Sequence, residues 1–171
     1  MTDDSDAPVQ TMWAGKYISV LKRGRWEYVS RTGSINAVVI LAEHDGKVIL
    51  IEQYRVPVGA RCLELPAGLV GDEDEHATVE GTAVKELEEE TGYTAERIER
   101  LGEFQSSPGL LAESFALVRA HGLKKVGEGG GTEHEDINVH LVAREDIPAF
   151  VAARRAEGMA IDVKLLLFMN F

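Results

Sequence analysis

The sequence is short of cysteine, of basic residues and of long apolar runs, and each shortage excludes a kind of protein. Its single cysteine, Cys62, cannot form an internal disulfide, so a cytoplasmic location fits best. No apolar run reaches about 18 residues, so no transmembrane helix is expected. The N-terminus is acidic and lacks the basic and then apolar pattern of a signal peptide, which agrees with that location.

Basic residues are outnumbered, because 18 Lys and Arg face 29 Asp and Glu and the net charge is −11. Nucleic acid backbones and anionic membranes attract clustered Lys and Arg, so neither is an expected partner. Apolar residues form 44% of the 171 positions, which is enough for the core of one domain with a small appendage. An acidic protein of this kind would need a cation to bind a phosphate compound.

Hydrophobic patterning predicts a strand-rich first part, one central helix and closing helices. Gly24 and the pair Asp45-Gly46 are turn signals, and each indicates a hairpin. Residues 127–131 include four glycines and are expected to be mobile. Strands are expected over 16–21, 26–29, 35–41, 48–52, 62–65, 98–104, 113–120 and 137–142, and helices over about 76–91, 148–157 and 162–170. This order predicts an α/β fold in which helices cover a mixed sheet.

Residues 85 to 93 read Lys-Glu-Leu-Glu-Glu-Glu-Thr-Gly-Tyr and carry most of the functional information. On a helix, at about 100° per residue, Glu86, Glu89 and Glu90 lie on one face. Their like charges repel, but Mg²⁺ prefers carboxylate oxygens and would make the same arrangement favourable. A solvated acidic face is the other interpretation, and the run alone leaves both open. Gly92 indicates where the helix ends.

This run resembles the second half of the Nudix box, which is written G-x5-E-x7-R-E-U-x-E-E-x-G-U with U a bulky apolar residue. The matching positions are Glu86, Leu87, Glu89, Glu90 and Gly92. The resemblance extends over roughly residues 13 to 170.

The first half of the box departs from the family pattern. At the standard spacing its Gly is Gly71, its first Glu is replaced by Ala77, and a lysine replaces its Arg. Alternatively Gly68 is the family's Gly, within a run Leu-Glu-Leu-Pro-Ala-Gly-Leu that is similar to the ADP-sugar branch of the family. The loop is then three residues longer, and Asp74 or Glu75 stands in for the Glu. We prefer the alignment on Gly68.

The resemblance implies a fold and a metal site. The fold is the Nudix α/β/α sandwich with a mixed sheet, in which residues 34–171 form the hydrolase domain. Residues 1–33 form a small N-terminal β segment that dimerises. The implied cofactor is Mg²⁺ or Mn²⁺, held by Glu86, Glu89, Glu90 and Ala67.

The same branch of the family contacts its substrate at positions that this sequence matches. These positions are Trp13, Trp26, Arg31, Arg55, Glu64 and Glu113. Arg55 would meet a phosphate, for which its planar guanidinium offers two donors. The two tryptophans would stack on adenine, at about 1–3 kcal/mol per base, or would pack in a core or an interface. The run Ser-Pro-Gly at 107–109 has the spacing seen in ADP-ribose pyrophosphatases.

A catalytic base is expected in the acidic loop that follows the glycine-rich stretch. The loop is similar to the one that carries the catalytic glutamate in the family, with Glu135 as our first choice and Glu133 as the close alternative. A carboxylate on a hinged loop can approach the attacking water after the substrate has entered. A solvated acidic loop is the other interpretation.

The resemblance as a whole implies Mg²⁺-dependent hydrolysis of a nucleoside diphosphate sugar, with ADP-ribose giving AMP and ribose 5-phosphate as the first candidate. GDP-mannose or another nucleotide sugar is the alternative substrate. A Nudix-like domain that binds a nucleotide without cleaving it is the alternative function. A homodimer is expected, because the branch exchanges its N-terminal strands between subunits.

Overall fold

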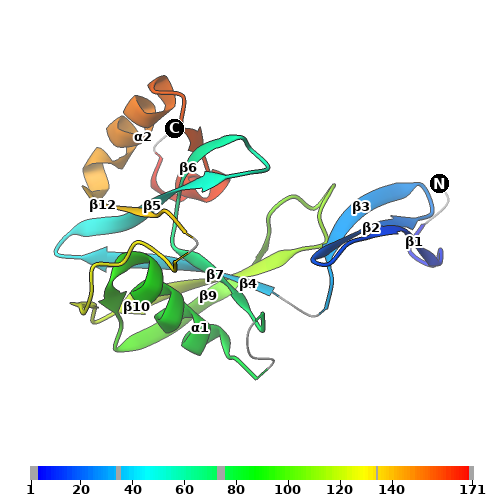
Figure 1. Cartoon of the computed structure of the whole chain (residues 1–171), viewed down its shortest axis with the longest axis horizontal. Helices are drawn as coiled ribbons and strands as arrows, with labels where there is room; N and C mark the ends of the chain where they lie inside the picture. The colour runs from blue at the N-terminus through cyan, green and yellow to red at the C-terminus, as the bar shows by residue number, and fades with distance from the viewer. Residues whose placement is uncertain (1–3, 34–35, 73–75, 134, 170–171) are drawn as a thin grey trace.

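The computed structural model describes residues 4–33, 36–72, 76–133 and 135–169, which form a layered body and a smaller sheet beside it (Figure 1). The strands of the layered body are β4 (Asn36–His44), β5 (Lys47–Arg55), β6 (Ala60–Glu64), β7 (Ala67–Val70), β9 (Arg97–Gln105), β10 (Ser114–His121), β12 (Asn138–Ala143) and β13 (Ala160–Ile161). They form a mixed sheet of order β13-β6-β5-β4-β10-β9, in which β12 pairs with β5 and β7 with β4. β4 and β10 run parallel, whereas β4 and β5 form the antiparallel hairpin expected at Asp45-Gly46.

Helical segments cover both faces of this sheet (Figure 1). α1 (Val79–Glu86) continues directly into a π-helical turn (Leu87–Thr91). α2 (Ile147–Ala156) and the 3-10 helices Arg144–Asp146 and Val163–Phe168 belong to the opposite side. A short pair, β8 (Tyr93–Thr94) with β11 (Lys124–Lys125), follows the π turn.

The side chains of β4 point alternately to the two faces of the sheet, and this explains the two hydrophobic cores. Val38 and Ile40 are fully buried with Leu87 of the π turn, whereas Val39 between them is buried with Ile147 of α2. Successive strand residues point to opposite faces, so an almost wholly apolar strand supplies both cores. The expected α/β/α sandwich with a mixed sheet is therefore confirmed.

Two expected helices differ from the structure in their bounds or type. The central helix begins at Val79, later than expected, because Thr78 caps it by accepting a hydrogen bond from the N–H of Gly81 at 3.1 Å. The closing helix, expected over 162–170, is a 3-10 helix from Val163 to Phe168. Among the described residues, no helix combines the length and the apolar character that crossing a bilayer requires.

The N-terminal segment forms a separate antiparallel sheet of β1 (Val9–Ala14), β2 (Ile18–Arg23) and β3 (Trp26–Arg31). Figure 1 shows this sheet projecting from the layered body. The hairpin at Gly24 was expected, but β1 was not, because every residue of β1 is exposed and its sequence shows no clear alternation. Backbone hydrogen bonds join Val29 to Leu110 and Ala112, at 2.8 and 2.9 Å, and attach the sheet to the body.

Candidate active site

A cavity of about 630 Å³ opens beside β7 and the helix formed by α1 and the π turn. Its walls come from the end of β5, from β7, from the helix and from the loop before β12. The residues that line it include Gln53, Arg55, Ala67, Gly68, Glu86, Glu89, Glu90, Thr132 and Glu135. The fold therefore brings together the three box glutamates, Ala67, Arg55 and one of the two candidate bases.

Glu90 is the buried acid of this cavity and is only 3% exposed. Its Oε2 accepts a hydrogen bond from the backbone N–H of Ala67 at 3.0 Å. Burial, opposed by that hydrogen bond and assisted by the charges of Glu86 and Glu135, raises the pKa of the Glu90 carboxyl to about 8. A cation beside this group would offset the cost of burying its charge.

Among the described residues, no three acidic, histidine or cysteine side chains are close enough together to coordinate one metal ion. Instead, Glu86, Glu89 and Glu90 line one wall of the cavity. Carboxylates repel one another, and Lys85 offsets part of this repulsion through an ion pair with Glu89 at 3.8 Å. The all-oxygen donor set fits Mg²⁺, which keeps several waters and takes substrate phosphates as further ligands.

Gly68 lies directly against Glu86. A Cβ at Gly68 would come within 2.2 Å of the carboxyl carbon of Glu86 and would displace that side chain. No described atom lies within 4 Å of the same position at Gly71. This packing favours the alignment of the box on Gly68. The candidate substitutes for the missing glutamate, Asp74 and Glu75, lie outside the described residues.

The end of the helix is tied to the glycine-rich stretch 127–131, which we call the glycine strap. The N–H groups of Gly130 and Gly131 donate to the carbonyls of Glu90 and Glu89, each at 2.9 Å. These hydrogen bonds dock on the helix end a stretch whose mobility stays a prediction. The reason is that the last carbonyls of a helix need donors, and these N–H groups supply them.

Of the two candidate bases, Glu135 lies at the cavity. Its Oε2 accepts hydrogen bonds from the backbone N–H and the hydroxyl of Thr132, at 2.9 and 3.0 Å. Glu133 is exposed, and it is not among the residues that line the cavity. The geometry therefore favours Glu135 over Glu133.

Arg55 and Glu64 form one unit at the cavity. Nε and Nη2 of Arg55 donate to the two carboxylate oxygens of Glu64, each at 2.7 Å. The hydrogen bonds and charge of Glu64 raise the pKa of Arg55 above its usual value, although burial opposes this. Glu64 is 5% exposed, and its carboxylate binds the Arg55 guanidinium through two parallel hydrogen bonds.

The remaining expected substrate contacts lie outside this cavity in the single chain. Arg31 forms an ion pair with Glu113, between β3 and the start of β10. Trp13 and Trp26 are 55% and 51% exposed on the N-terminal sheet. Trp26 lines a second hollow of about 520 Å³ beside Pro108.

Gln53 and Thr132 are among the cavity-lining residues that were not expected site residues. Gln53 is 9% exposed and lines the cavity two residues before Arg55, on the same face of β5. Its position in the run Gln-Tyr-Arg was the signal that could have identified it. Thr132 holds Glu135, and only its closeness to Glu135 in the sequence hinted at that contact.

The model of a protein family described as the NUDIX domain matches residues 33–160. An ADP-ribose pyrophosphatase of Bacillus subtilis is 32% identical over 136 residues, which cover 78% of this chain and 70% of that protein. A methanol dehydrogenase activator of Bacillus methanolicus is 38% identical over 111 residues, which cover 64% of this chain and 57% of that protein. A crystal structure of an ADP compounds hydrolase superposes with a TM-score of 0.71 at 21% identity, over 94% of this chain and 89% of that one.

Proposed function

This chain belongs to the Nudix hydrolase family, and on that premise we propose that it cleaves the diphosphate of a nucleoside diphosphate sugar with the help of Mg²⁺ or Mn²⁺. ADP-ribose is the first candidate substrate, with AMP and ribose 5-phosphate as products. The observation that carries the proposal is one cavity lined by Glu86, Glu89, Glu90, Arg55 and Glu135. The ADP-ribose pyrophosphatase relative supports the choice of substrate.

In this mechanism Glu86, Glu89 and Glu90, with the carbonyl of Ala67, would hold the cations. Bound divalent cations neutralise the diphosphate and lower the pKa of the attacking water. Their presence would also keep Glu90 ionised, because its carboxyl is otherwise inclined to bind a proton near neutral pH.

The other cavity residues act directly on the diphosphate and the water. Arg55, held flat by Glu64, donates to the diphosphate and orients it. Glu135 accepts a proton from the water while the water oxygen bonds to one phosphorus of the diphosphate. The bond from that phosphorus to the bridging oxygen breaks, and the second phosphate leaves with this oxygen. The hydrogen bonds from Thr132 support this role, because they aim the Glu135 carboxylate. No covalent intermediate is needed.

The N-terminal segment, residues 1–33, completes the proposal as the dimerising part of the chain. Large apolar side chains are exposed on it, among them Met12, Trp13 and Trp26. In a homodimer the rings of Trp13 and Trp26 would reach the partner's site and stack on adenine, with Arg31 and Glu113 near the same end of the site. The cytoplasmic location drawn from the sequence stays a prediction that cell fractionation can check.

A Mg²⁺-dependent assay of the full chain on ADP-ribose and on GDP-mannose tests the function, with products identified by mass. We expect AMP and ribose 5-phosphate from ADP-ribose and slower turnover of GDP-mannose. Faster turnover of GDP-mannose would change the substrate. Tight binding without turnover of either compound would instead point to a nucleotide-binding domain.

The proposed metal site is tested with Glu90→Gln, which keeps the shape of the side chain and removes its charge. This variant should stay folded by circular dichroism and lose metal-dependent turnover. A folded variant with full activity would sink the proposed metal site.

A further inference from the structure

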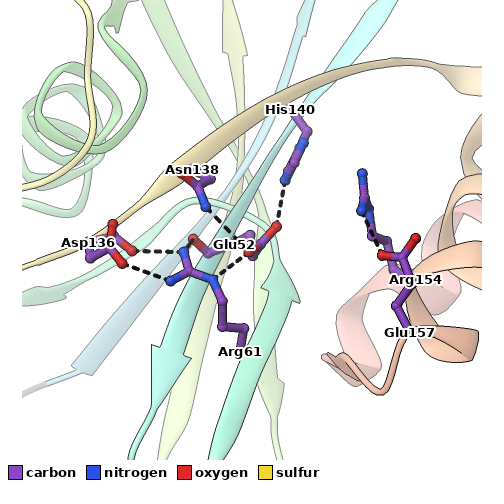
Figure 2. Close-up of polar contacts among 7 residues, drawn as sticks. All are labelled: Glu52, Arg61, Asp136, Asn138, His140, Arg154 and Glu157. Atoms are coloured by element: carbon purple, nitrogen blue, oxygen red, sulfur yellow. Dashed lines mark hydrogen bonds and ion pairs between the residues drawn. The ribbon is translucent and has the colours of Figure 1, made fainter.

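Another buried carboxylate, that of Glu52 on β5, is not among the groups that line the cavity. Glu52 is 7% exposed and accepts hydrogen bonds from Arg61, Asn138 and His140 (Figure 2). Nδ2 of Asn138 lies 3.3 Å from Oε1, Nε2 of His140 lies 3.0 Å from Oε2, and Nε of Arg61 donates to Oε1. Burial alone would raise the pKa of Glu52, but these hydrogen bonds together hold it below its usual value. The result is a fixed anion that anchors Arg61.

Arg61 uses its two remaining nitrogens to reach the loop before β12. Nη1 donates to Oδ2 of Asp136 at 2.8 Å, and Nη2 donates to the backbone carbonyl of Asp136 at 3.1 Å. Nη2 also reaches the backbone carbonyl of Glu52, again at 3.1 Å. Figure 2 shows the guanidinium between the two acids. Because one bond goes to the main chain, Arg61 fixes the path of the backbone at the residue that follows Glu135.

The same loop is also fixed at its other end, by the glycine strap. Gly131 donates to the carbonyl of Glu89, and a Cβ on Gly131 would come within 2.7 Å of Cβ of Glu135. Between the two fixed ends, the N–H of Glu135 donates to the carbonyl of Thr132 at 3.0 Å. The short loop that carries Glu135 is thus held between the metal-binding helix and Arg61.

We propose that Arg61 is a positioning residue for Glu135, which it places at the cavity by holding the backbone and side chain of Asp136. This inference rests on the proposed function, in which Glu135 is the base. The side chain of Asp136 is 85% exposed, so its ion pair adds little to stability. The contact instead fixes the position of Glu135. A displacement of a reacting group by about 1 Å can cost on the order of 100-fold in rate.

The test compares Arg61→Gln with Arg154→Gln in the full-length enzyme. Arg154 is a matched control, because its side chain is 31% exposed against 29% for Arg61 and it also pairs with a carboxylate, that of Glu157. Figure 2 shows this pair apart from the network around Glu52. We expect Arg61→Gln to lower kcat by roughly 10- to 100-fold with KM within about twofold, and Arg154→Gln to leave both unchanged. An unchanged kcat in Arg61→Gln would overturn the proposal.

A double-mutant cycle separates positioning from general damage to the fold. In a Glu135→Gln background, Arg61→Gln should cause no further loss of kcat, because the group that it positions is already disabled. Equal losses in both backgrounds would show that Arg61 acts independently of Glu135 and would overturn the proposal. Asp136→Ala leaves the pair of Arg61 with Glu52 intact, and it should lower kcat by a smaller factor than Arg61→Gln.

Hydrogen exchange of residues 130–133 and 135–137 gives a readout that needs no turnover. These amides should exchange faster in Arg61→Gln than in the wild type and in Arg154→Gln, while the rest of the chain keeps its protection. Unchanged exchange would overturn the proposal. If the wild type cleaves no nucleotide sugar, the proposed function fails, whereas the exchange data still decide whether Arg61 holds this loop.

Discussion

At the scale of single residues, two of the glutamates that the described fold buries, Glu52 and Glu90, have different electrostatic surroundings. Glu52 is surrounded by donors, which hold its pKa below the usual value against the effect of burial. Glu90 has one backbone donor, from Ala67, and burial raises its pKa to about 8. The first is built to stay charged in the folded protein alone, whereas the second is suited to sharing its charge with a cation.

Glu52→Gln should destabilise the protein in a manner that depends on pH. A carboxyl whose pKa is lowered on folding stabilises the fold above its ordinary pKa of 4.5, and this contribution is lost as the pH falls. Losing charge-assisted hydrogen bonds should cost about 1–3 kcal/mol at pH 7. Urea unfolding at about pH 7 and pH 3 measures the difference, which should shrink at the lower pH.

The control for this prediction is Glu43→Gln. Glu43 also pairs with an arginine, Arg144, but its side chain is 48% exposed. An exposed ion pair contributes less than about 1 kcal/mol, so this variant should unfold almost like the wild type at both pH values. An equal cost of the two substitutions would contradict the role given to the buried network.

The sequence predicted Glu86, Glu89 and Glu90 as neighbours because they share a face at helical spacing, and the fold brings all three to one cavity. It did not predict the network of Glu52, because its members come from three strands. Hydrophobic periodicity and residue spacing describe one helix or strand at a time, so they do not predict side-chain contacts between different strands.

At the scale of elements, the helix end and the glycine strap depend on each other. Gly129 has a φ of +72°, and a Cβ there would lie 2.4 Å from the carbonyl carbon of Thr91. Gly46, in the turn between β4 and β5, has nearly the same φ, +74°, and no described atom near its Cβ position. The two glycines therefore share one backbone conformation and differ in their packing.

Gly129→Ala should consequently cost more stability than Gly46→Ala and should also lower kcat. Both variants place a side chain in the left-handed region, at about 1–2 kcal/mol, but only Gly129→Ala must also push the strap from the helix end. Thermal unfolding and steady-state kinetics of the two variants measure the effect. Equal losses of stability, with full activity in both, would mean that the strap does not need its close contact.

The elements themselves were largely predictable, because hairpin turns and apolar strands have strong local signals. The Asp45-Gly46 hairpin shows this, since both residues have the positive φ that such a turn requires. The π turn over Leu87–Thr91 and the 3-10 helix over Val163–Phe168 were not predicted. Both segments have helical spacing in the sequence. Whether such a segment forms an α, a π or a 3-10 helix is decided by its packing and by the hydrogen bonds at its ends.

At the scale of the whole molecule, the N-terminal sheet and the layered body meet beside the run Ser-Pro-Gly. The hollow there is lined by Trp26, Tyr28 and Pro108, and it lies apart from the acidic cavity. A single chain thus separates the rings expected to bind adenine from the residues expected to act on the diphosphate. In the proposed homodimer, a second copy of the chain would bring these two sets of residues together.

Trp26→Ala should raise KM for ADP-ribose far more than it lowers kcat. Stacking on adenine is worth about 1–3 kcal/mol, which corresponds to roughly fivefold or more in KM. Tyr17→Ala is the control, because Tyr17 is also an exposed aromatic residue of the N-terminal segment but does not line the hollow. Steady-state kinetics measure both, and a KM that Trp26→Ala leaves unchanged would remove the stacking role.

The π turn also limits where this chain can gain or lose residues. Removing one residue between Glu86 and Gly92 would allow an ordinary α-helical turn, but it would rotate everything after the cut by about 100°. Gly92 would then lose its close contact with Gly127. In the present structure a Cβ added to Gly92 would lie only 2.2 Å from the carbonyl oxygen of Gly127. The count of residues across the π turn therefore has to be kept.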